Sequence, residues 1–135
     1  MSASELPASV RAFAFADWRN QPGQDYGHPH DAWLESVQVR HRREQDDPQQ
    51  VATEIEAEFL LSYHDQRLWL RYGRVRRYRL GEGGGQGPGG PGRDDWLEDD
   101  FSSVDAGHFR HRIRFASGAV WEIVFSEFEW RIDPA

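Results

Sequence analysis

The sequence predicts a mainly β, single-domain protein in which about six or seven antiparallel strands curl into a sandwich or a partly open barrel, with at most short helices. Three observations lead to this fold class. Residues 109–115 alternate Phe, His or Ile with arginine, which is the period of a half-buried strand. Ser117 and Gly118 then supply a turn before the apolar run 120–125, so these segments form a hairpin. Few segments show the period of a helix.

The first half of the chain contains three further expected strands. Residues 1–10 are expected to be a loose tail, and residues 10–18 fit either a short helix or a strand. In the segments that follow, apolar side chains alternate with polar or charged ones, which indicates strands with one buried face. These strands are expected over residues 32–41 (with Trp33, Val37 and Val39 on one face), 51–63 and 67–72.

The middle of the chain is less regular. Gly73 interrupts the alternation and indicates a bulge or a tight bend, after which residues 75–80 continue as a strand. Residues 81–93 are rich in glycine and are expected to form a flexible loop. The acidic residues 94–101 are expected to form about one helical turn. A change of parity near Ser126 predicts that the C-terminal residues extend the last strand or form another one.

Length and composition favour one domain over residues 1–135 with a large aromatic core. The chain has six Trp, eight Phe and four Tyr residues, and each of these side chains buries a large area. It has no cysteine, which excludes disulfides and thiolate metal sites and fits a reducing cytoplasm. The N-terminal residues lack the features of a signal peptide, and no apolar run is long enough for a transmembrane helix. We therefore expect a cytoplasmic protein without membrane contact.

The charge pattern narrows the function classes. All sixteen basic residues are arginine, and the formal net charge is −7. The missing lysine excludes a Walker-type loop and Schiff-base chemistry, and the arginine, glycine, alanine and proline usage indicates a GC-rich bacterial genome. A net negative charge argues against general nucleic-acid binding, which depends on neutralising phosphates. It fits either a basic partner or simple solubility.

One cluster of residues has the types that bind metals. His28, His30 and Asp31 lie close together in the sequence, and histidines with a neighbouring carboxylate are typical ligands of zinc or a similar ion. His64 would complete such a site if its turn folds nearby. Alternatively, Asp31 caps backbone N–H groups and His30 holds the loop by hydrogen bonds. We expect no bound cofactor.

The sequence contains candidate bases for a hydrolytic site but no suitable nucleophile. His30 or His111 would be the base, with a carboxylate to orient it. However, Ser117 lies in the expected hairpin turn, so it does not have the context of a nucleophile. His111 falls on the apolar side of its strand and is expected to be a hydrogen-bonded core residue. We therefore expect no enzymatic activity.

Charged side chains occupy the outward positions of several strands. Glu54, Glu56 and Glu58 share one strand face, and arginines line the outward positions of others. Such a surface is either a solvated network of ion pairs or a docking surface for a protein or an anionic ligand, since arginine binds carboxylates and phosphates through two parallel hydrogen bonds. Trp69 shares parity with two arginines and would be a binding hot spot if it is exposed. The candidate partner-binding residues are Arg67, Trp69, Arg71, Arg110, Arg112 and Arg114.

Three sequence segments carry a resemblance to known proteins. They are HDAWLESVQV at residues 30–39, AEFLLSYHDQRLWLRYGRVRRYRL at 57–80 and HRIRFASGAVWEIVFSEFEW at 111–130. Together they resemble an uncharacterised family of small bacterial β-rich proteins. They are also loosely similar to the immunity protein 50 family of polymorphic toxin systems, in which a His-Asp-Ala segment, here residues 30–32, opens the domain.

The resemblance implies a non-enzymatic cytoplasmic protein that blocks a cognate toxin, and it transfers no catalytic residue. We therefore expect a protein-binding domain that acts as an immunity or accessory factor. Two alternatives remain open, a β-barrel that binds a small molecule or a metal ion and a homodimer formed through sheet edges or an aromatic face. Neither nucleic acid nor a membrane is an expected partner.

Overall fold

The computed structural model describes residues 6–14, 32–43, 49–61, 66–81 and 95–134. These residues form eight strands in two antiparallel sheets and one short helix, which confirms the predicted fold class. The first sheet has the strand order β1-β2-β3-β8 and the second has the order β4-β7-β6-β5. The elements are α1 (Ala8–Ala14), β1 (Trp33–Arg43), β2 (Val51–Leu60), β3 (Gln66–Gly73), β4 (Arg77–Leu80), β5 (Trp96–Asp105), β6 (His108–Phe115), β7 (Val120–Phe125) and β8 (Glu127–Pro134).

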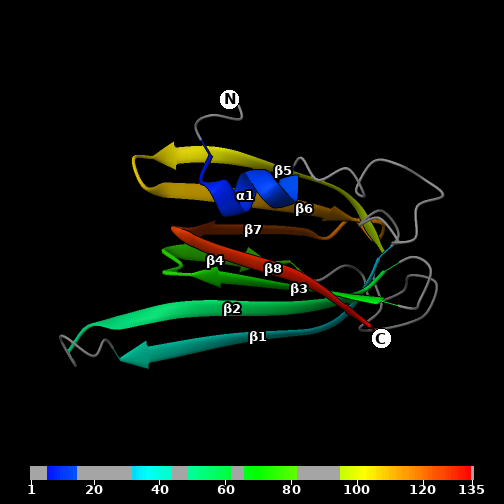
Figure 1. Cartoon of the computed structure of the whole chain (residues 1–135), viewed down its shortest axis with the longest axis horizontal. Coiled ribbons are helices and arrows are strands. Elements are labelled where there is room, and N and C mark those ends of the chain that lie inside the picture. Colours follow the sequence, from blue (N-terminus) through cyan, green and yellow to red (C-terminus); the bar gives the residue numbers. More distant parts are fainter. Residues whose placement is uncertain (1–5, 15–31, 44–48, 62–65, 82–94, 135) are drawn as a thin grey trace.

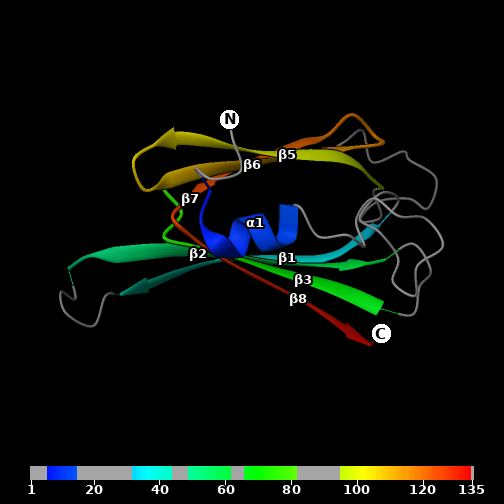
Figure 2. The ribbon, with the colours of Figure 1, turned by 45° about the horizontal axis from the view of Figure 1, so that its top comes forward.

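The two sheets form two layers with α1 between them at one side (Figures 1 and 2). The chain crosses between the layers at Gly73, where β3 of the first sheet leads to β4 of the second, and again at Ser126 between β7 and β8. The Ser126 N–H donates to the Gly73 carbonyl, which joins the two crossings. A Cβ on Gly73 would lie 2.9 Å from that of Glu127, so only glycine fits there. The predicted bend at Gly73 is thus confirmed.

The alternation read from the sequence describes the buried faces of the central strands correctly. In β2, Ile55, Ala57 and Phe59 are buried, and in β3 the side chains of Leu68 and Leu70 are buried. In the second sheet, the expected hairpin is formed by β6 and β7, and Gly118 in its turn has a φ of 95°, which glycine adopts readily. These faces meet in one core between the sheets.

The expected loose tail over residues 1–10 is wrong for residues 6–10. Leu6 and Val10 are buried, and Val10 lies within α1. Phe13 of α1 is fully buried, with its ring 6.0 Å from that of Phe101 on β5 and 5.5 Å from that of Trp130 on β8. A helix of this length would be unstable alone. It forms here because Phe13 is buried between the edges of both sheets.

The helical turn expected within residues 94–101 is also wrong, because this segment belongs to β5. Glu98 lies opposite Arg114 and Asp100 opposite Arg112 in the register with β6. Opposite charges on neighbouring strands stabilise such pairs and compensate for the low strand propensity of the acidic run.

Two other expectations are refined. The C-terminal residues form a separate strand, β8, in the first sheet rather than an extension of β7. In β1, Val37 and Val39 share the inner face as expected, and Val37 is 37% exposed because β1 is the edge of its sheet. The expected place of Trp33 on the same face is wrong, because a bulge after Leu34 turns Trp33 to the other face. The glycine-rich segment lies almost entirely outside the described residues, which resume at residue 95. Within the described part of the chain, no helix is long and apolar enough to cross a membrane.

Candidate functional site

The predicted metal or ligand residues His28, His30, Asp31 and His64 all lie outside the described residues. Among the residues that the structure does describe, no three His, Asp or Glu side chains come together as a metal site would require. The metal prediction therefore stays a prediction.

The six candidate partner-binding residues do not lie on one surface. Arg67, Trp69 and Arg71 are on β3 and point to the outer face of the first sheet, because their neighbours Leu68 and Leu70 are buried. The other three are on β6 and point to the outer face of the second sheet, on the opposite side of the molecule. The structure thus divides the predicted surface into two faces. The second group consists of Arg110, Arg112 and Arg114.

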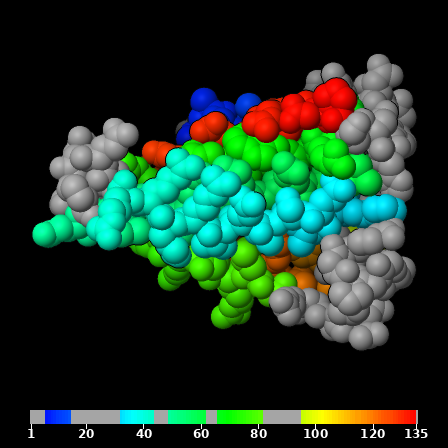
Figure 3. Space-filling model, turned by 90° about the horizontal axis from the view of Figure 1, so that it is seen from below, coloured from blue at the N-terminus to red at the C-terminus, as the bar shows by residue number. Residues whose placement is uncertain are grey.

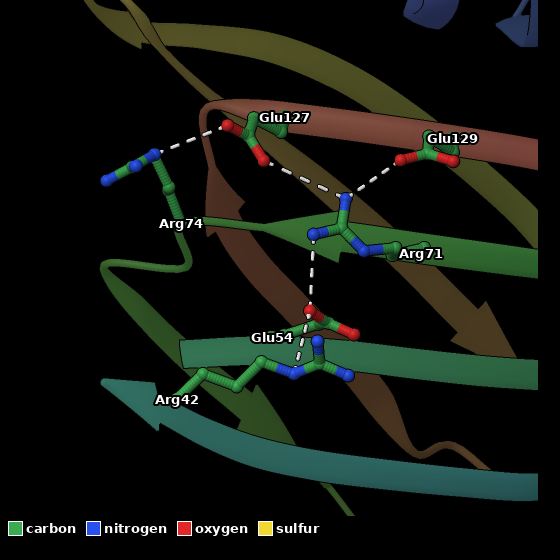
Figure 4. Close-up of polar contacts among 6 residues, drawn as sticks. All are labelled: Arg42, Glu54, Arg71, Arg74, Glu127 and Glu129. Carbon is green, nitrogen blue, oxygen red and sulfur yellow. Dashed lines mark hydrogen bonds and ion pairs between the residues drawn. The ribbon is translucent and has the colours of Figure 1, made fainter. Parts of the chain in front are cut away.

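On the outer face of the first sheet, Arg71 is the centre of an ion-pair network (Figure 4). Its guanidinium lies 3.2 Å from the Glu54 carboxylate on β2 and 3.0 Å from that of Glu129 on β8. Glu127 is a third partner at 3.8 Å, and Arg42 of β1 approaches Glu54 at 3.7 Å. The network therefore joins the outer positions of all four strands.

This network explains why an outward-facing glutamate is only 7% exposed. Burial would raise the pKa of Glu54, but the hydrogen bond and the charge of Arg71 outweigh it and hold that pKa below its ordinary value. In the same way, burial would lower the pKa of Arg71, yet Glu54 and the other carboxylates raise it. Both groups are charged and mutually neutralised.

The other two candidates on this face are also engaged within the molecule. Arg67 Nε donates to Glu35 at 2.6 Å, and this hydrogen bond raises the pKa of Arg67. Trp69 is half-buried, with the Arg131 guanidinium 4.1 Å from its ring centre, which is a cation–π contact. Arg131 in turn donates to Asp133 at 2.7 Å. A partner would have to displace these contacts to reach the indole.

The outer face of the second sheet has a different charge balance. Five arginines and four carboxylates occupy its outward positions, a small excess of positive charge in a chain whose net charge is −7. Two of these arginines form ion pairs, Arg114 with Glu98 at 2.8 Å and Arg112 with Glu122 at 3.7 Å, and Asp105 binds Arg76 at 2.7 Å. The charged outward residues of this arginine face are Arg77, Arg79, Arg110, Arg112, Arg114, Glu98, Asp100, Asp105 and Glu122.

Three arginines of the arginine face make no ion pair within the described part of the chain. Arg77 and Arg110 flank Val124 in the strand register, and Val124 is only 2% exposed although it faces outward. This burial is expected where the alkyl stems of long side chains cover an apolar residue. The third is Arg79, on β4, opposite Glu122.

Arg110 has an additional unsatisfied group. Its Nε atom is buried without a hydrogen-bond partner, and so is the Oγ atom of Ser102, the residue directly opposite it on β5. On the same face, a surface hollow of about 260 Å³ is lined by Glu98, Asp99, Asp100, Arg112 and Arg114. Both of its arginines are ion-paired, so the three arginines without ion pairs lie outside this hollow.

Sequence reasoning missed Arg77 and Arg79, although a signal was present. The segment RVRRYRL at residues 74–80 is dense in arginine, and its alternation places Arg77 and Arg79 on the same side. The sequence did not show that β4 joins the sheet of β6, and this pairing adds them to the arginine face.

His111, considered above as a possible base, is a core residue as expected. It is 1% exposed, and Phe101 stacks on its ring at 3.9 Å. Its Nε2 atom lies 2.7 Å from the Asp99 carboxylate and its Nδ1 atom 2.6 Å from the Tyr72 hydroxyl. Both ring nitrogens are therefore engaged inside the core, one with a carboxylate and one with a hydroxyl. His111 thus links the two sheets and faces no solvent.

Comparisons with protein-family models, with curated proteins and with solved structures returned no match to this chain.

Proposed function

We propose that this chain is a non-enzymatic protein-binding domain that recognises an acidic surface of another protein through the arginine face. The observation that supports this most is the contrast in ion pairing, because Arg77, Arg79 and Arg110 have no internal carboxylate partner among the described residues. Exposed guanidinium groups on a rigid sheet bind carboxylates with defined geometry, and arginine is enriched among interface hot spots.

The setting that we propose is a bacterial cytoplasm, where the domain acts as an immunity or accessory factor. This rests on the absence of cysteine and on the resemblance described above. In that role the arginine face would cover an acidic patch of the partner and block its active surface. Because the whole chain has a net charge of −7, attraction to an acidic partner would be confined to the arginine face and would set the orientation of docking.

The proposal is tested with the protein as bait in a lysate of its source organism. A partner should be captured in stoichiometric amount by the wild type and lost with Arg110→Glu/Arg112→Glu. The double variant Arg11→Glu/Arg40→Glu is the matched control, since it changes the net charge equally on other exposed surfaces. Thermal unfolding should show that both double variants are folded. Equal capture by the two variants would contradict the proposal.

A captured toxin would also allow a direct assay of neutralisation. An equimolar amount of the wild-type protein should abolish the activity of that toxin, whereas Arg110→Glu/Arg112→Glu should leave it active. Neutralisation by both proteins would place the binding surface elsewhere.

A further inference from the structure

The short strand β4 lies at a sheet edge. It carries two arginines without ion pairs among the described residues, Arg77 and Arg79, and the exposed Tyr78. Within the described part of the chain it pairs only with β7, so its other edge has no partner strand. The segment that contains β4 projects from the surface below β1 in Figure 3, where it is coloured yellow-green. Its backbone N–H and C=O groups on that edge are available for pairing with another strand.

The side chains of β4 divide between the two faces of the sheet. Tyr78 lies opposite the buried Ile123 and so faces inward, but it is 44% exposed at the edge. Arg77 and Arg79 face outward, in the same rows as Arg110 and Arg112. An added strand would therefore place its alternate side chains beside two arginines and its intervening ones beside Tyr78.

The arginines that precede β4 differ from those within it. Arg74 Nε donates to Glu127 at 3.2 Å, and Arg76 Nη2 donates to Asp105 at 2.7 Å. These two contacts hold the bend that leads into β4. Within the strand, Arg77 and Arg79 make no ion pair among the described residues, although Glu122 lies opposite Arg79 and pairs with Arg112.

The other three sheet edges are less suited to strand addition. The edges β5 and β8 both contact α1, whose Phe13 packs against them. The edge strand β1 is also open, but its Arg40 donates to Gln38 at 2.7 Å and its His41 lies 3.0 Å from the Thr53 hydroxyl. On β4, by contrast, two arginines without such contacts flank an exposed tyrosine within four residues.

We propose that β4 accepts an extended acidic segment of a partner protein as an additional strand of the second sheet. Carboxylates at every second position of that segment pair with Arg77 and Arg79, and an apolar side chain between them packs on Tyr78. Backbone hydrogen bonds to the free edge fix the register. This inference rests on the proposed function and names the partner chemistry that it would recognise.

The probe for this site is a blocked peptide in which Asp alternates with Val, measured by isothermal titration at low salt. We expect saturable binding with a Kd below about 1 mM. Binding should weaken at least about tenfold with Arg77→Glu/Arg79→Glu and stay unchanged with Arg11→Glu/Arg40→Glu. A scrambled peptide with the same composition should bind at least about tenfold more weakly, because its carboxylates no longer alternate.

Two N-methylated peptides test the backbone pairing. Methylation of alternate amides removes the donors on one edge of the added strand, so one methylation pattern should abolish binding while the other retains it. Equal binding of both patterns, equal binding of the scrambled peptide or absence of saturable binding would each overturn the strand-addition model.

The two proposals fail in different ways. If a lysate partner is lost with Arg110→Glu/Arg112→Glu but is captured normally by Arg77→Glu/Arg79→Glu, the arginine face binds its partner without β4. That result overturns the present inference and leaves the proposed function in place.

Discussion

On the outer face of the first sheet, Arg67, Arg71 and Arg131 each have a carboxylate within 3.2 Å. On the outer face of the second sheet, three arginines have none within the described part of the chain. The two faces use the same residue type in different ways. On the first face most arginines bind carboxylates of their own sheet, and Arg40 on the edge strand β1 donates to Gln38 instead. On the second face three of five arginines make no ion pair within the described part of the chain. The number of arginines on a strand therefore says little about binding until their carboxylate partners are known.

Removal of Arg71 should give the largest effect on stability. Arg71→Leu leaves the buried Glu54 without its nearest cation and should lower the free energy of unfolding by about 1–3 kcal/mol. The same change on the other face, Arg112→Leu, should cost less than about 0.5 kcal/mol, since both members of its ion pair are exposed. Urea unfolding measures both variants. Equal losses would mean that the two faces do not differ in this way.

The pH dependence of stability should report the same difference. The folded-state pKa of Glu54 is lowered, so its stabilising contribution is present above its ordinary pKa of 4.5 and is lost as the pH falls through the lower folded value. The variant Glu54→Gln should therefore show a shallower loss of stability below pH 4.5 than the wild type. Chemical unfolding at a series of pH values measures the slopes.

Loss of the contact between Arg131 and Trp69 should have a smaller effect on stability. Arg131→Gln removes the cation–π contact and should lower the free energy of unfolding by about 0.5–1 kcal/mol, measured as a shift in the unfolding midpoint. It should also make Trp69 more accessible to a collisional fluorescence quencher. A change of midpoint without greater quenching would show that Arg131 does not cover the ring.

The smallest change in the free energy of unfolding is expected for a substitution at Arg110, and the direction of that change tests whether the side chain supports the fold. Arg110→Met keeps the stem over Val124 and removes the buried Nε that has no hydrogen-bond partner. We expect stability to be unchanged or to rise by up to about 1 kcal/mol, while partner capture falls. A loss above 1 kcal/mol would mean that the Arg110 guanidinium supports the fold and is not held available for binding.

The alternation of side chains was enough to predict which residues are buried in the central strands. It shows whether a residue faces the core or the solvent, as it did for Leu68, Leu70 and His111. It does not show to which sheet a strand belongs. Arg67 and Arg110 are both correctly predicted to face outward, yet they lie on opposite sides of the molecule. Strand order depends on pairings between distant segments, and no local pattern records them.

Two errors have a common physical reason. The acidic run at the start of β5 looks unlike a strand, and the first residues of the described chain form a helix too short to be stable alone. Arginines on β6 stabilise the former, and Phe13 of α1 packs against Phe101 on β5 and Trp130 on β8. In both cases tertiary partners outweigh local propensity. The many arginines in residues 74–80 could be recognised in the sequence. Their place on the arginine face could not, because it depends on the pairing of β4 with β7.

The pairing of β3 with β8 has a consequence for the rate of folding. Arg71 and the Glu129 that it binds are 58 positions apart in the sequence, so the first sheet is completed only after a large loop has closed. The hairpins β1–β2 and β6–β7 need only short closures and should form early. High contact order of this kind is typical of domains that refold in milliseconds to seconds. Until β8 arrives, β3 is itself an open edge, and a chain caught at that stage can pair with another copy and aggregate.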